Sequence, residues 1–283
     1  MTVNTFGRKT TYTQINNTTG HERRTLMTMY AEERQQAMAQ LVAARGRLSV
    51  TVLADEYDVT TETVRRDLST LERMGLVRRV HGGAVPANSL SVIESGLTER
   101  DSANTSEKDQ IARAALAQLP PAGSTILIDA GSTTSRLASL LPRDHRLTVV
   151  THAVPVAARL AGNPQIELHL LPGRVRSTTQ AAVGPETVAA LANLRADVLF
   201  LGTNGITADH GLTTPDWDEA ATKRAMVASA RRSVVLADAT KIGTESPQRF
   251  ASLDEIDVLV TDDAISPAAR RDLTRTGLEV VVA

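Results

Sequence analysis

Apolar residues recur with the period of a helix in three consecutive stretches between positions 31 and 71. The first stretch predicts a helix over 31–45, which Gly46 ends. A short polar connection at 58–60 separates the second stretch from the third, and the Thr60 hydroxyl can cap the third helix. Two short helices joined in this way predict a helix-turn-helix at about 48–67. The apolar positions are Ala37, Met38, Leu41 and Val42, then Val50, Leu53, Ala54 and Tyr57, and finally Val64, Leu68 and Leu71.

Two adjacent arginines, Arg65 and Arg66, lie off the apolar stripe of the third helix. Such a pair is common on any solvated helix, so the pair alone does not decide between a plain surface and a DNA contact. The residues that follow favour DNA, because 76–84 alternates apolar and basic residues after Gly75 and runs into Gly-Gly, as in a β-hairpin wing. The candidate DNA-binding residues are Thr60, Thr61, Thr63, Arg65, Arg66, Arg78, Arg79 and His81.

The run at 59–68, Val-Thr-Thr-Glu-Thr-Val-Arg-Arg-Asp-Leu, and the run at 79–84, Arg-Val-His-Gly-Gly-Ala, carry a resemblance to a known family. Together with Leu71-Glu72 and Gly75-Leu76 they resemble the DNA-binding domain of the DeoR family of bacterial regulators. The resemblance covers about 30–86, and the family usually has Ser where this chain has Thr60. It implies a winged helix-turn-helix and a double-stranded DNA operator as a partner.

Composition narrows the class of protein. The 283 residues suffice for one small and one medium domain, and a net charge of -1 means that DNA affinity must come from a local patch. Aromatic residues make up 2% of the chain, which argues against stacking-based binding of single strands or RNA. No apolar run approaches the ~20 residues of a membrane helix, and no secretory signal is present, so no membrane partner is expected. The absence of cysteine excludes disulfides and is compatible with the cytoplasm, the expected location.

Two stretches lack an apolar period. Residues 1–29 are polar and are expected to be a disordered tail, which is either a spectator or a basic arm that touches DNA. Met27 and Met29 directly precede the matched region and are alternative translation starts. Residues 87–105 are rich in Ser, Asn and Gly and predict a linker, partly helical over 94–100, where Arg100 resembles an arginine of the family's hinge.

From 106 to 283, short apolar runs alternate with amphipathic stretches. This alternation predicts an α/β domain with a mostly parallel sheet that helices cover on both faces. The predicted strands are 125–129, 147–151, 166–171, 198–202, 234–238, 258–262 and 279–282. The predicted helices are one around 111–119 and those at 132–141, 154–160, 186–194, 219–230 and 267–276.

Polar residues follow the ends of these strands, where ligands bind in such sheets. After the first strand, Gly131 and the hydroxyls of Ser132, Thr133 and Thr134 enter a helix and could hold a phosphate, although an ordinary capped turn has the same pattern. The sequence is neither GxGxxG nor a Walker A motif, so neither a dinucleotide nor ATP is indicated. Glu219 and Lys223 also fit a plain i, i+4 helix pair, and Lys241 a solvated loop lysine.

A second resemblance concerns about 106–283, which looks like the sensor domain of the same family, similar in fold to ribose-5-phosphate isomerases and CoA transferases. It rests on 108–112, 129–134, 149–151, Val183-Gly184, Ala196-Asp197, 211–216, Glu219-Ala220, Lys223 and 238–241. Two departures, His152 for the usual Asn and Pro172 for the usual Gly, concern the expected ligand site. The candidate effector residues are Asp129, Gly131, Ser132, Thr133, Thr134, Thr151, His152, Gly173, Arg174, Asn204, Asp216, Glu219, Lys223, Asp238 and Lys241.

The resemblance implies a transcriptional regulator, a repressor of a sugar operon that a phosphorylated sugar releases from DNA. It is similar to fructose-operon repressors, which implies fructose 1-phosphate as the effector. A homo-oligomer, dimer or tetramer, is expected because one small helix-turn-helix has limited affinity and dimers read two half-sites.

A rival interpretation is an enzyme, a sugar-phosphate isomerase or acyl transferase with a DNA-binding tether. Asp129, Asp216, Glu219 and Lys241 would then supply acid–base groups. The resemblance is to the sensor domain and not to the enzymes, so no enzyme activity and no cofactor are expected. The six histidines are scattered and no cysteine accompanies them, so no metal site is expected either.

Overall fold

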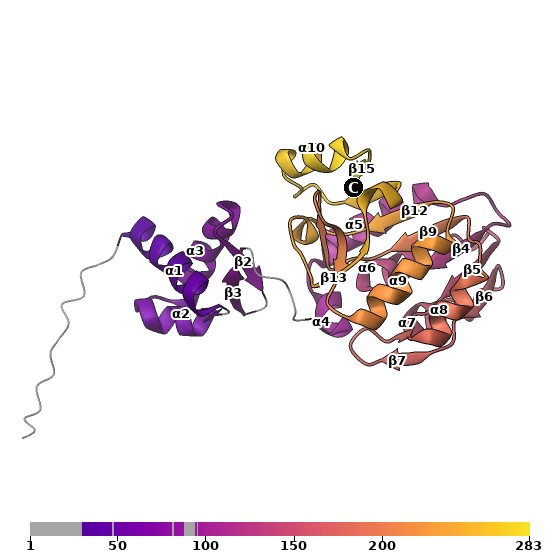
Figure 1. The fold of residues 1–283 in the computed structure, drawn as a ribbon, viewed down its shortest axis with the longest axis horizontal. Coiled ribbons are helices and arrows are strands. Elements are labelled where there is room, and N and C mark those ends of the chain that lie inside the picture. Colours follow the sequence, from indigo (N-terminus) through magenta and orange to yellow (C-terminus); the bar gives the residue numbers. More distant parts are fainter. Residues whose placement is uncertain (1–29, 47, 81, 88–93, 95) are drawn as a thin grey trace, which may run out of the picture. The chain divides into compact units, whose positions relative to one another are not determined.

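A computed structural model describes residues 30–46, 48–80, 82–87, 94 and 96–283. Contacts divide the chain into two compact units, Met1–Asn88 and Ser89–Ala283, here called the smaller and the larger unit (Figure 1). The predicted tail at 1–29 and the predicted DNA contact His81 lie outside the described residues.

The smaller unit packs its helices around one apolar cluster. The residues predicted for the third helix, Val64, Leu68 and Leu71, are all buried there, as are Met38 and Val42 of the first helix. The Thr60 hydroxyl accepts a hydrogen bond from the Thr63 amide at 3.2 Å, so the predicted cap is confirmed. The elements are α1 (Ala31–Arg45), β1 (Leu48–Ser49), α2 (Val50–Tyr57), α3 (Thr61–Arg73), β2 (Val77–Val80) and β3 (Gly83–Pro86).

The predicted wing is confirmed. β2 and β3 pair antiparallel with Val80 opposite Gly83, and β3 also pairs with β1 to give the order β1-β3-β2. A Cβ atom on Gly83 would lie 2.0 Å from the carbonyl oxygen of Leu48, so only glycine allows this close approach of the two backbones. The chain therefore forms a winged helix-turn-helix.

The larger unit is built on a seven-stranded sheet with the order β15-β14-β12-β9-β4-β5-β6. All neighbouring strands in it run parallel, in agreement with the predicted sheet. The strands are β4 (Thr125–Ile128), β5 (Leu147–Thr151), β6 (Ile166–Leu170), β9 (Val198–Leu201), β12 (Ser233–Leu236), β14 (Val258–Thr261) and β15 (Glu279–Val282).

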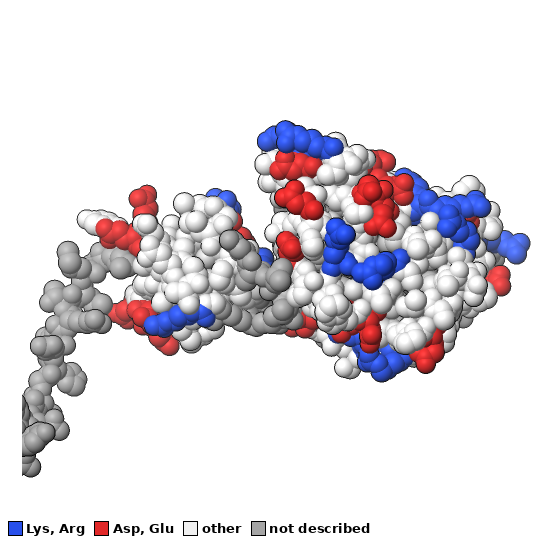
Figure 2. Space-filling model, viewed as in Figure 1, with Lys and Arg blue, Asp and Glu red and all other residues white. Residues whose placement is uncertain are grey.

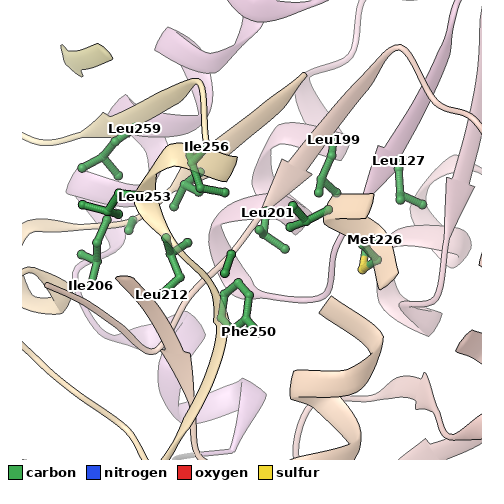
Figure 3. Close-up of a cluster of buried hydrophobic side chains, with 14 of the residues drawn as sticks. Leu127, Leu199, Leu201, Ile206, Leu212, Met226, Phe250, Leu253, Ile256 and Leu259 are labelled. Atoms are coloured by element: carbon green, nitrogen blue, oxygen red, sulfur yellow. The ribbon is translucent and has the colours of Figure 1, made fainter. Parts of the chain in front are cut away.

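Helices cover both faces of this sheet, as the alternation of short apolar runs with amphipathic stretches predicted. Successive strand residues enter two separate clusters, with Leu127 in one and Ile126 and Ile128 in the other. Figure 3 shows the first cluster, where Leu199 and Leu201 pack near Met226 and Phe250. The helices are α5 (Thr105–Ala115), α6 (Ser132–Leu140) and α7 (Val154–Leu160) on one face, and α8 (Pro185–Ala192), α9 (Trp217–Ser229) and α10 (Pro267–Arg275) on the other.

Several short strands outside the main sheet were not predicted. β7 (Arg174–Arg176) and β8 (Ala181–Val183) form a hairpin. β10 (Gly205–Thr207), β11 (Gly211–Thr214) and β13 (Gln248–Ala251) form a small antiparallel sheet. The short helical turns η1 (Leu116–Gln118), η2 (Ala239–Lys241) and η3 (Leu253–Glu255) complete the unit.

The linker predicted over 87–105 differs from the structure. Residues 97–102 form helix α4 (Leu97–Ser102), and the Leu97 amide donates to the Thr178 carbonyl of the larger unit at 2.9 Å. Arg136 of α6 also pairs with Asp101 of α4. The second half of the predicted linker is therefore part of the larger unit, because polar side chains of the sheet domain bind it. No helix in the described part of the chain is long and apolar enough to cross a membrane.

Candidate functional site

The exposed start of α3 carries the predicted DNA-reading residues. Arg65 and Arg66 are exposed, and the Arg65 guanidinium lies 3.4 Å from Glu62 Oε2, on the neighbouring turn. Thr61 is exposed at the first position of the helix. The winged fold thus presents side chains that can donate and accept hydrogen bonds on a helix of the kind that enters a major groove.

A buried ion pair fixes the orientation of α3. Asp67 is 4% exposed and accepts hydrogen bonds from Arg34 Nε and Gln35 Nε2 of α1, both at 2.7 Å. Sequence reasoning missed Asp67, although it lies three residues after Val64 and four before Leu71 and so falls on the buried stripe. Because Asp67 directly follows Arg66, its ion pair with Arg34 determines which way the exposed arginines of α3 face.

The two arginines of the wing differ in their surroundings. The Arg79 amide donates to Glu72 Oε1 and its guanidinium to Ser69 Oγ, both at 2.8 Å, so Arg79 ties the wing to α3. Arg78 lies on the opposite face of β2, because side chains alternate along a strand. Burial lowers the pKa of Arg78, and the charge of Glu72 opposes that effect. That both arginines contact the DNA backbone stays a prediction.

The larger unit shows no uniformly basic face in Figure 2. Acidic and basic side chains are interspersed there, and a row of basic side chains lies over α10. DNA binding depends on neutralising phosphates with clustered basic residues. The visible face of the larger unit therefore offers less to DNA than the start of α3 does.

The strongest interactions at the carboxyl edge of the main sheet centre on Asp129, which follows β4 and is fully buried. Lys223 Nζ from α9 bonds Asp129 Oδ2 and also donates to the Gly202 carbonyl at 3.0 Å. His152 Nε2 lies 2.9 Å from Asp129 Oδ1, and its Nδ1 lies 2.8 Å from the Ala182 carbonyl. The carboxylate thus joins residues from α9 and from the end of β5.

The surroundings of Asp129 keep it ionised. Burial alone would raise the pKa of its carboxyl, but the charge of Lys223 and the hydrogen bond with His152 outweigh burial and lower the pKa to about 2. His152 Nδ1 faces the Ala182 carbonyl oxygen, whereas its Nε2 lies beside both the Asp129 carboxylate and the Ala130 amide, which donates to it at 3.2 Å.

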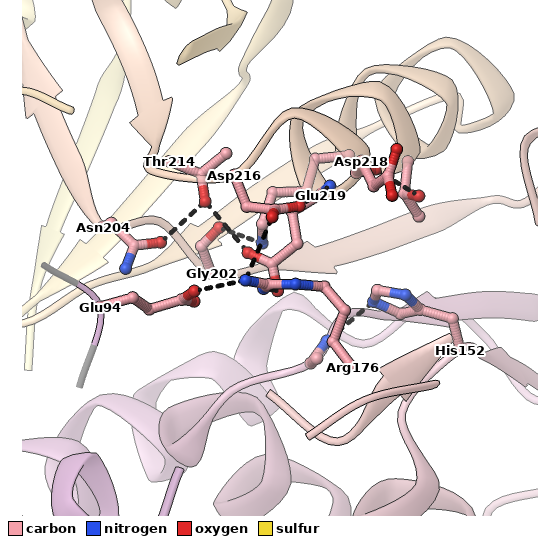
Figure 4. Close-up of polar contacts among 12 residues, drawn as sticks. Glu94, His152, Arg176, Gly202, Asn204, Thr214, Asp216, Asp218 and Glu219 are labelled. Atoms are coloured by element: carbon pink, nitrogen blue, oxygen red, sulfur yellow. Dashed lines mark hydrogen bonds and ion pairs between the residues drawn. The ribbon is translucent and has the colours of Figure 1, made fainter. Parts of the chain in front are cut away.

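A second group of charges surrounds Arg176 of β7 (Figure 4). Its guanidinium lies 2.9 Å from Glu94 Oε2, 3.2 Å from Asp216 Oδ2 and 2.7 Å from Glu219 Oε1. Burial would lower the pKa of Arg176, but the hydrogen bond with Glu94 and the charges of the three carboxylates raise it. Burial would likewise raise the pKa of Glu219, yet Lys223 and Arg176 lower it. The surroundings of Arg176 and Glu219 therefore favour their charged forms.

Asp216 and Glu219 have further partners that hold them in place. Asp216 Oδ1 caps α9 by accepting from the Glu219 amide at 2.9 Å. The Thr214 hydroxyl lies 3.1 Å from Glu219 Oε2 and 3.2 Å from Asn204 Oδ1 (Figure 4). The cluster can accept and donate many hydrogen bonds, as a site for a polyhydroxyl ligand requires.

The first turn of α6 lies at the same edge of the sheet. Ser132, Thr133 and Thr134 are 7%, 7% and 0% exposed, and the helix has no side-chain cap because Gly131 precedes it. Gly131 has a φ of 153°, which favours glycine. Amides of an uncapped first turn, with hydroxyls beside them, are suited to bind an anion.

Lys108 is a charged residue near this turn that the sequence analysis did not select. It is 4% exposed, and its ammonium donates to the carbonyls of Arg100, at 2.6 Å, and Ala103. Burial lowers its pKa, and the charges of Asp238 and Lys241 also act on it. The helical spacing of Lys108, Ile111 and Ala115 could have indicated that Lys108 is buried.

Most of the predicted effector residues lie at this edge, but some have other roles. The predicted residues in the charged clusters or the first turn of α6 are Asp129, Gly131, Ser132, Thr133, Thr134, His152, Asn204, Asp216, Glu219 and Lys223. Asp238 caps the turn at Thr240 and bonds Asn104, and Lys241 lies close enough to influence Lys108.

Arg174, Gly173 and Thr151 are not part of the clusters. Arg174 is exposed and pairs with Asp218 at 2.6 Å. Gly173 serves close packing, since a Cβ there would lie 2.2 Å from Thr187 Oγ1, and the Thr151 hydroxyl donates to the Ile128 carbonyl. Arg176 and Glu94 were missed because neither lies in the short polar runs that end the predicted strands, where Arg174 lies. No group of three or more acidic or histidine side chains in the described ranges is arranged to hold a metal ion.

Comparisons with known proteins agree with both halves of the structure. Residues 34–89 match the model of the DeoR-like helix-turn-helix domain, and residues 103–263 match the model of the DeoR C terminal sensor domain. Among solved structures, the ribose 5-phosphate isomerase A of Methanocaldococcus jannaschii aligns with 50% of this chain and 55% of that one, at 16% identity. Its TM-score of 0.37 is too low to support any statement on function.

Two relatives are similar over nearly their whole length. The HTH-type transcriptional regulator GlpR of Haloferax volcanii is 37% identical over 89% of this chain and 98% of the relative. The glycerol-3-phosphate regulon repressor of Escherichia coli is 32% identical over 83% of this chain and 92% of the relative. Both relatives are regulators of transcription and not enzymes. The chain belongs to the DeoR family of DNA-binding transcriptional regulators.

Proposed function

We propose that this regulator binds a phosphorylated sugar at the carboxyl edge of the larger unit and that the bound sugar releases it from an operator. The observation that carries the proposal is the uncapped first turn of α6, where three hydroxyl residues are buried beside free helix amides. A phosphate is the ligand group that such a turn binds best. Lys108 and Lys241 would supply positive charge beside it.

The carboxylates of the neighbouring clusters suit the other end of such a ligand. The carboxylate oxygens of Asp129, Asp216 and Glu219 can accept hydrogen bonds from sugar hydroxyls. One relative is named for a glycerol-3-phosphate regulon, which supports a small phosphorylated polyol. Fructose 1-phosphate is our first candidate, and glycerol 3-phosphate is the second.

On the DNA side, we propose a repressor that binds as a dimer or tetramer. A dimer places two copies of α3 on two half-sites of an operator, which gives affinity that one helix lacks. Arg65 and Arg66 would contact bases or phosphates, and the wing would contact the backbone.

The contribution of the exposed arginines can be measured directly. Arg65→Ala or Arg66→Ala should weaken operator binding by about 1–3 kcal/mol if the residue reads a base, and should change the preferred site. The operator would be selected from genomic fragments with the purified protein, and affinity measured at fixed salt. Arg45→Ala removes an equally exposed charge from α1, next to Glu56, and should have a smaller effect. Unchanged binding by both α3 variants would show that this helix does not read the operator.

The phosphate site has an equally direct test. Ser132→Ala combined with Thr133→Ala should leave operator binding intact, but the concentration of fructose 1-phosphate or glycerol 3-phosphate needed for release should rise about tenfold or more. Hydrogen bonds to a charged group contribute about 1.5–3 kcal/mol each, which supports this magnitude. Lys241→Ala should act in the same direction, and the unphosphorylated sugars should be inert.

A matched control lies on the same helix. Ser139 is exposed on α6, and its hydroxyl donates to the Ser135 carbonyl, away from the first turn. Ser139→Ala should therefore respond to the sugar phosphate like the wild type. Identical release curves for the wild type and the double variant would remove the first turn of α6 from the proposed site.

A further inference from the structure

One stretch of the larger unit leads toward the DNA-binding unit and also contacts the proposed ligand site. We call residues 94 and 96–104 the connecting segment, because only 89–93 separate it in sequence from the smaller unit. Glu94 pairs with Arg176, Lys108 donates to the carbonyls of Arg100 and Ala103, and Asn104 bonds Asp238. Side chains beside the ligand site thus hold the segment at both of its ends.

The hydrogen bonding between the connecting segment and the ligand site is incomplete. Several buried polar atoms in it have no hydrogen-bond partner among the described residues. They are Glu94 Oε1, Arg100 Nε and Nη2, and Arg176 Nη1. Arg176 Nη1 lies near Glu219, but without the geometry of a hydrogen bond. Buried polar groups of native proteins are usually satisfied, so this cluster indicates that other groups bind here in another state.

The charges at the site are unbalanced. Around Arg176, three carboxylates, those of Glu94, Asp216 and Glu219, face one guanidinium. A ligand that adds a phosphate to this edge therefore favours the departure of one carboxylate.

Glu94 is the carboxylate that can leave most easily. Asp129 is held by Lys223 and His152, Asp216 caps α9, and Glu219 also bonds Thr214. In contrast, the Glu94 carboxylate has Arg176 as its one partner within the described ranges. Its side chain is 8% exposed, so it is kept from water without being fully hydrogen-bonded.

We propose that Glu94 is an internal competitor of the effector, which displaces the Glu94 carboxylate from Arg176 and so releases the connecting segment. This inference rests on the proposed function, since it describes how the sugar phosphate acts. Oxygen atoms of the ligand accept the hydrogen bonds that Arg176 otherwise donates to Glu94. Because binding and release are linked, the pairing of Glu94 with Arg176 weakens effector binding by the same factor by which the effector weakens the pairing.

Glu94→Gln in the full-length protein tests the inference, because it removes the charge and keeps the shape. The variant should bind fructose 1-phosphate or glycerol 3-phosphate about tenfold more tightly than the wild type, a typical size for such coupling. It should also bind the operator more weakly in the absence of any sugar phosphate. Amide exchange at Leu97, whose N–H donates to Thr178, should be faster in the variant than in the wild type.

Asp218→Asn is the matched control. Asp218 pairs with Arg174 on the same hairpin as Arg176, but its side chain is 46% exposed, and no contact joins it to the connecting segment within the described residues. It should change neither effector affinity nor exchange at Leu97. Effector affinity of Glu94→Gln equal to the wild type, or an equal gain in Asp218→Asn, would overturn the competition while leaving the proposed function intact. If the wild type binds neither sugar phosphate, the proposed function fails and this inference fails with it.

Discussion

Replacing Asp67 by alanine is expected to destabilise the smaller unit and to abolish operator binding. The change leaves the Arg34 guanidinium and the Gln35 amide of α1 without their common partner. Removing one member of a buried ion pair costs about 3–5 kcal/mol, and the lower end applies here because the Arg34 side chain is 14% exposed. A small domain has little stability to lose, so much of the smaller unit should be unfolded at equilibrium.

Hydrogen exchange measures this loss within the full-length chain. Amides of α1 and α3 should exchange roughly 100-fold faster in Asp67→Ala, the factor that corresponds to about 3 kcal/mol. The exchange rates in Asp67→Asn should lie between those of the wild type and of Asp67→Ala, since the amide keeps one acceptor oxygen. The control Asp55→Ala removes an exposed carboxylate from α2 and should exchange like the wild type. Protection of α3 that survives in Asp67→Ala would show that apolar packing alone orients the helix.

The smaller unit was predictable because its local signals agree with its fold. The stripe of Val64, Leu68 and Leu71, the cap at Thr60 and the glycines of the wing each specify the same structure within a few residues. Asp67 was missed because its partners cannot be read from the residues around it. Its burial depends on Arg34 and Gln35, which lie more than thirty residues earlier.

In the larger unit, prediction succeeded where strands are buried on both faces. The run 198–201 is continuously apolar, and 147–151 is apolar apart from two threonines. The parallel sheet follows from the alternation of such runs with helices. The strands of the β7–β8 hairpin and of the small sheet have three or four residues each, and all except β8 contain glycine or a charged residue. Such strands are too short to show an alternation of apolar and polar residues, so the hairpin that carries Arg176 was missed.

The ligand site was predictable only as far as chain topology places groups together. Asp129, His152 and Glu219 were selected because each follows a strand or the loop after it. The pairing of Glu94 with Arg176 joins residues 82 positions apart, and no local pattern indicates it. Arg174 was selected instead of Arg176 because it comes directly after a turn, yet it lies on the surface and pairs with Asp218.

The largest effect in the larger unit is expected from Lys223. Lys223→Met keeps the apolar stem but removes the ammonium that bonds the fully buried Asp129. An uncompensated buried carboxylate costs about 3–5 kcal/mol, so unfolding in urea at pH 7 should begin at a markedly lower concentration. Hydrogen exchange of amides in β4 and β9, which pair in the main sheet, follows the unfolding of this unit. The double variant with Asp129→Asn and Lys223→Met should lose less stability than the sum of the losses in the two single variants.

The pH dependence of stability tests whether the pair of Lys223 and Asp129 causes the destabilisation. The pKa of Asp129 is about 2, below its ordinary value of 3.8, so the carboxylate stabilises the folded state above pH 3.8. That contribution, about 2 kcal/mol from the size of the shift, is lost as the pH falls from 3.8 toward 2. In Lys223→Met, burial dominates and raises the pKa of Asp129, so protonation relieves the unpaired charge. The stability difference between variant and wild type should therefore shrink as the pH falls. A difference that stays constant from pH 7 to pH 3 would show that lost packing, and not the charge on Asp129, causes the destabilisation.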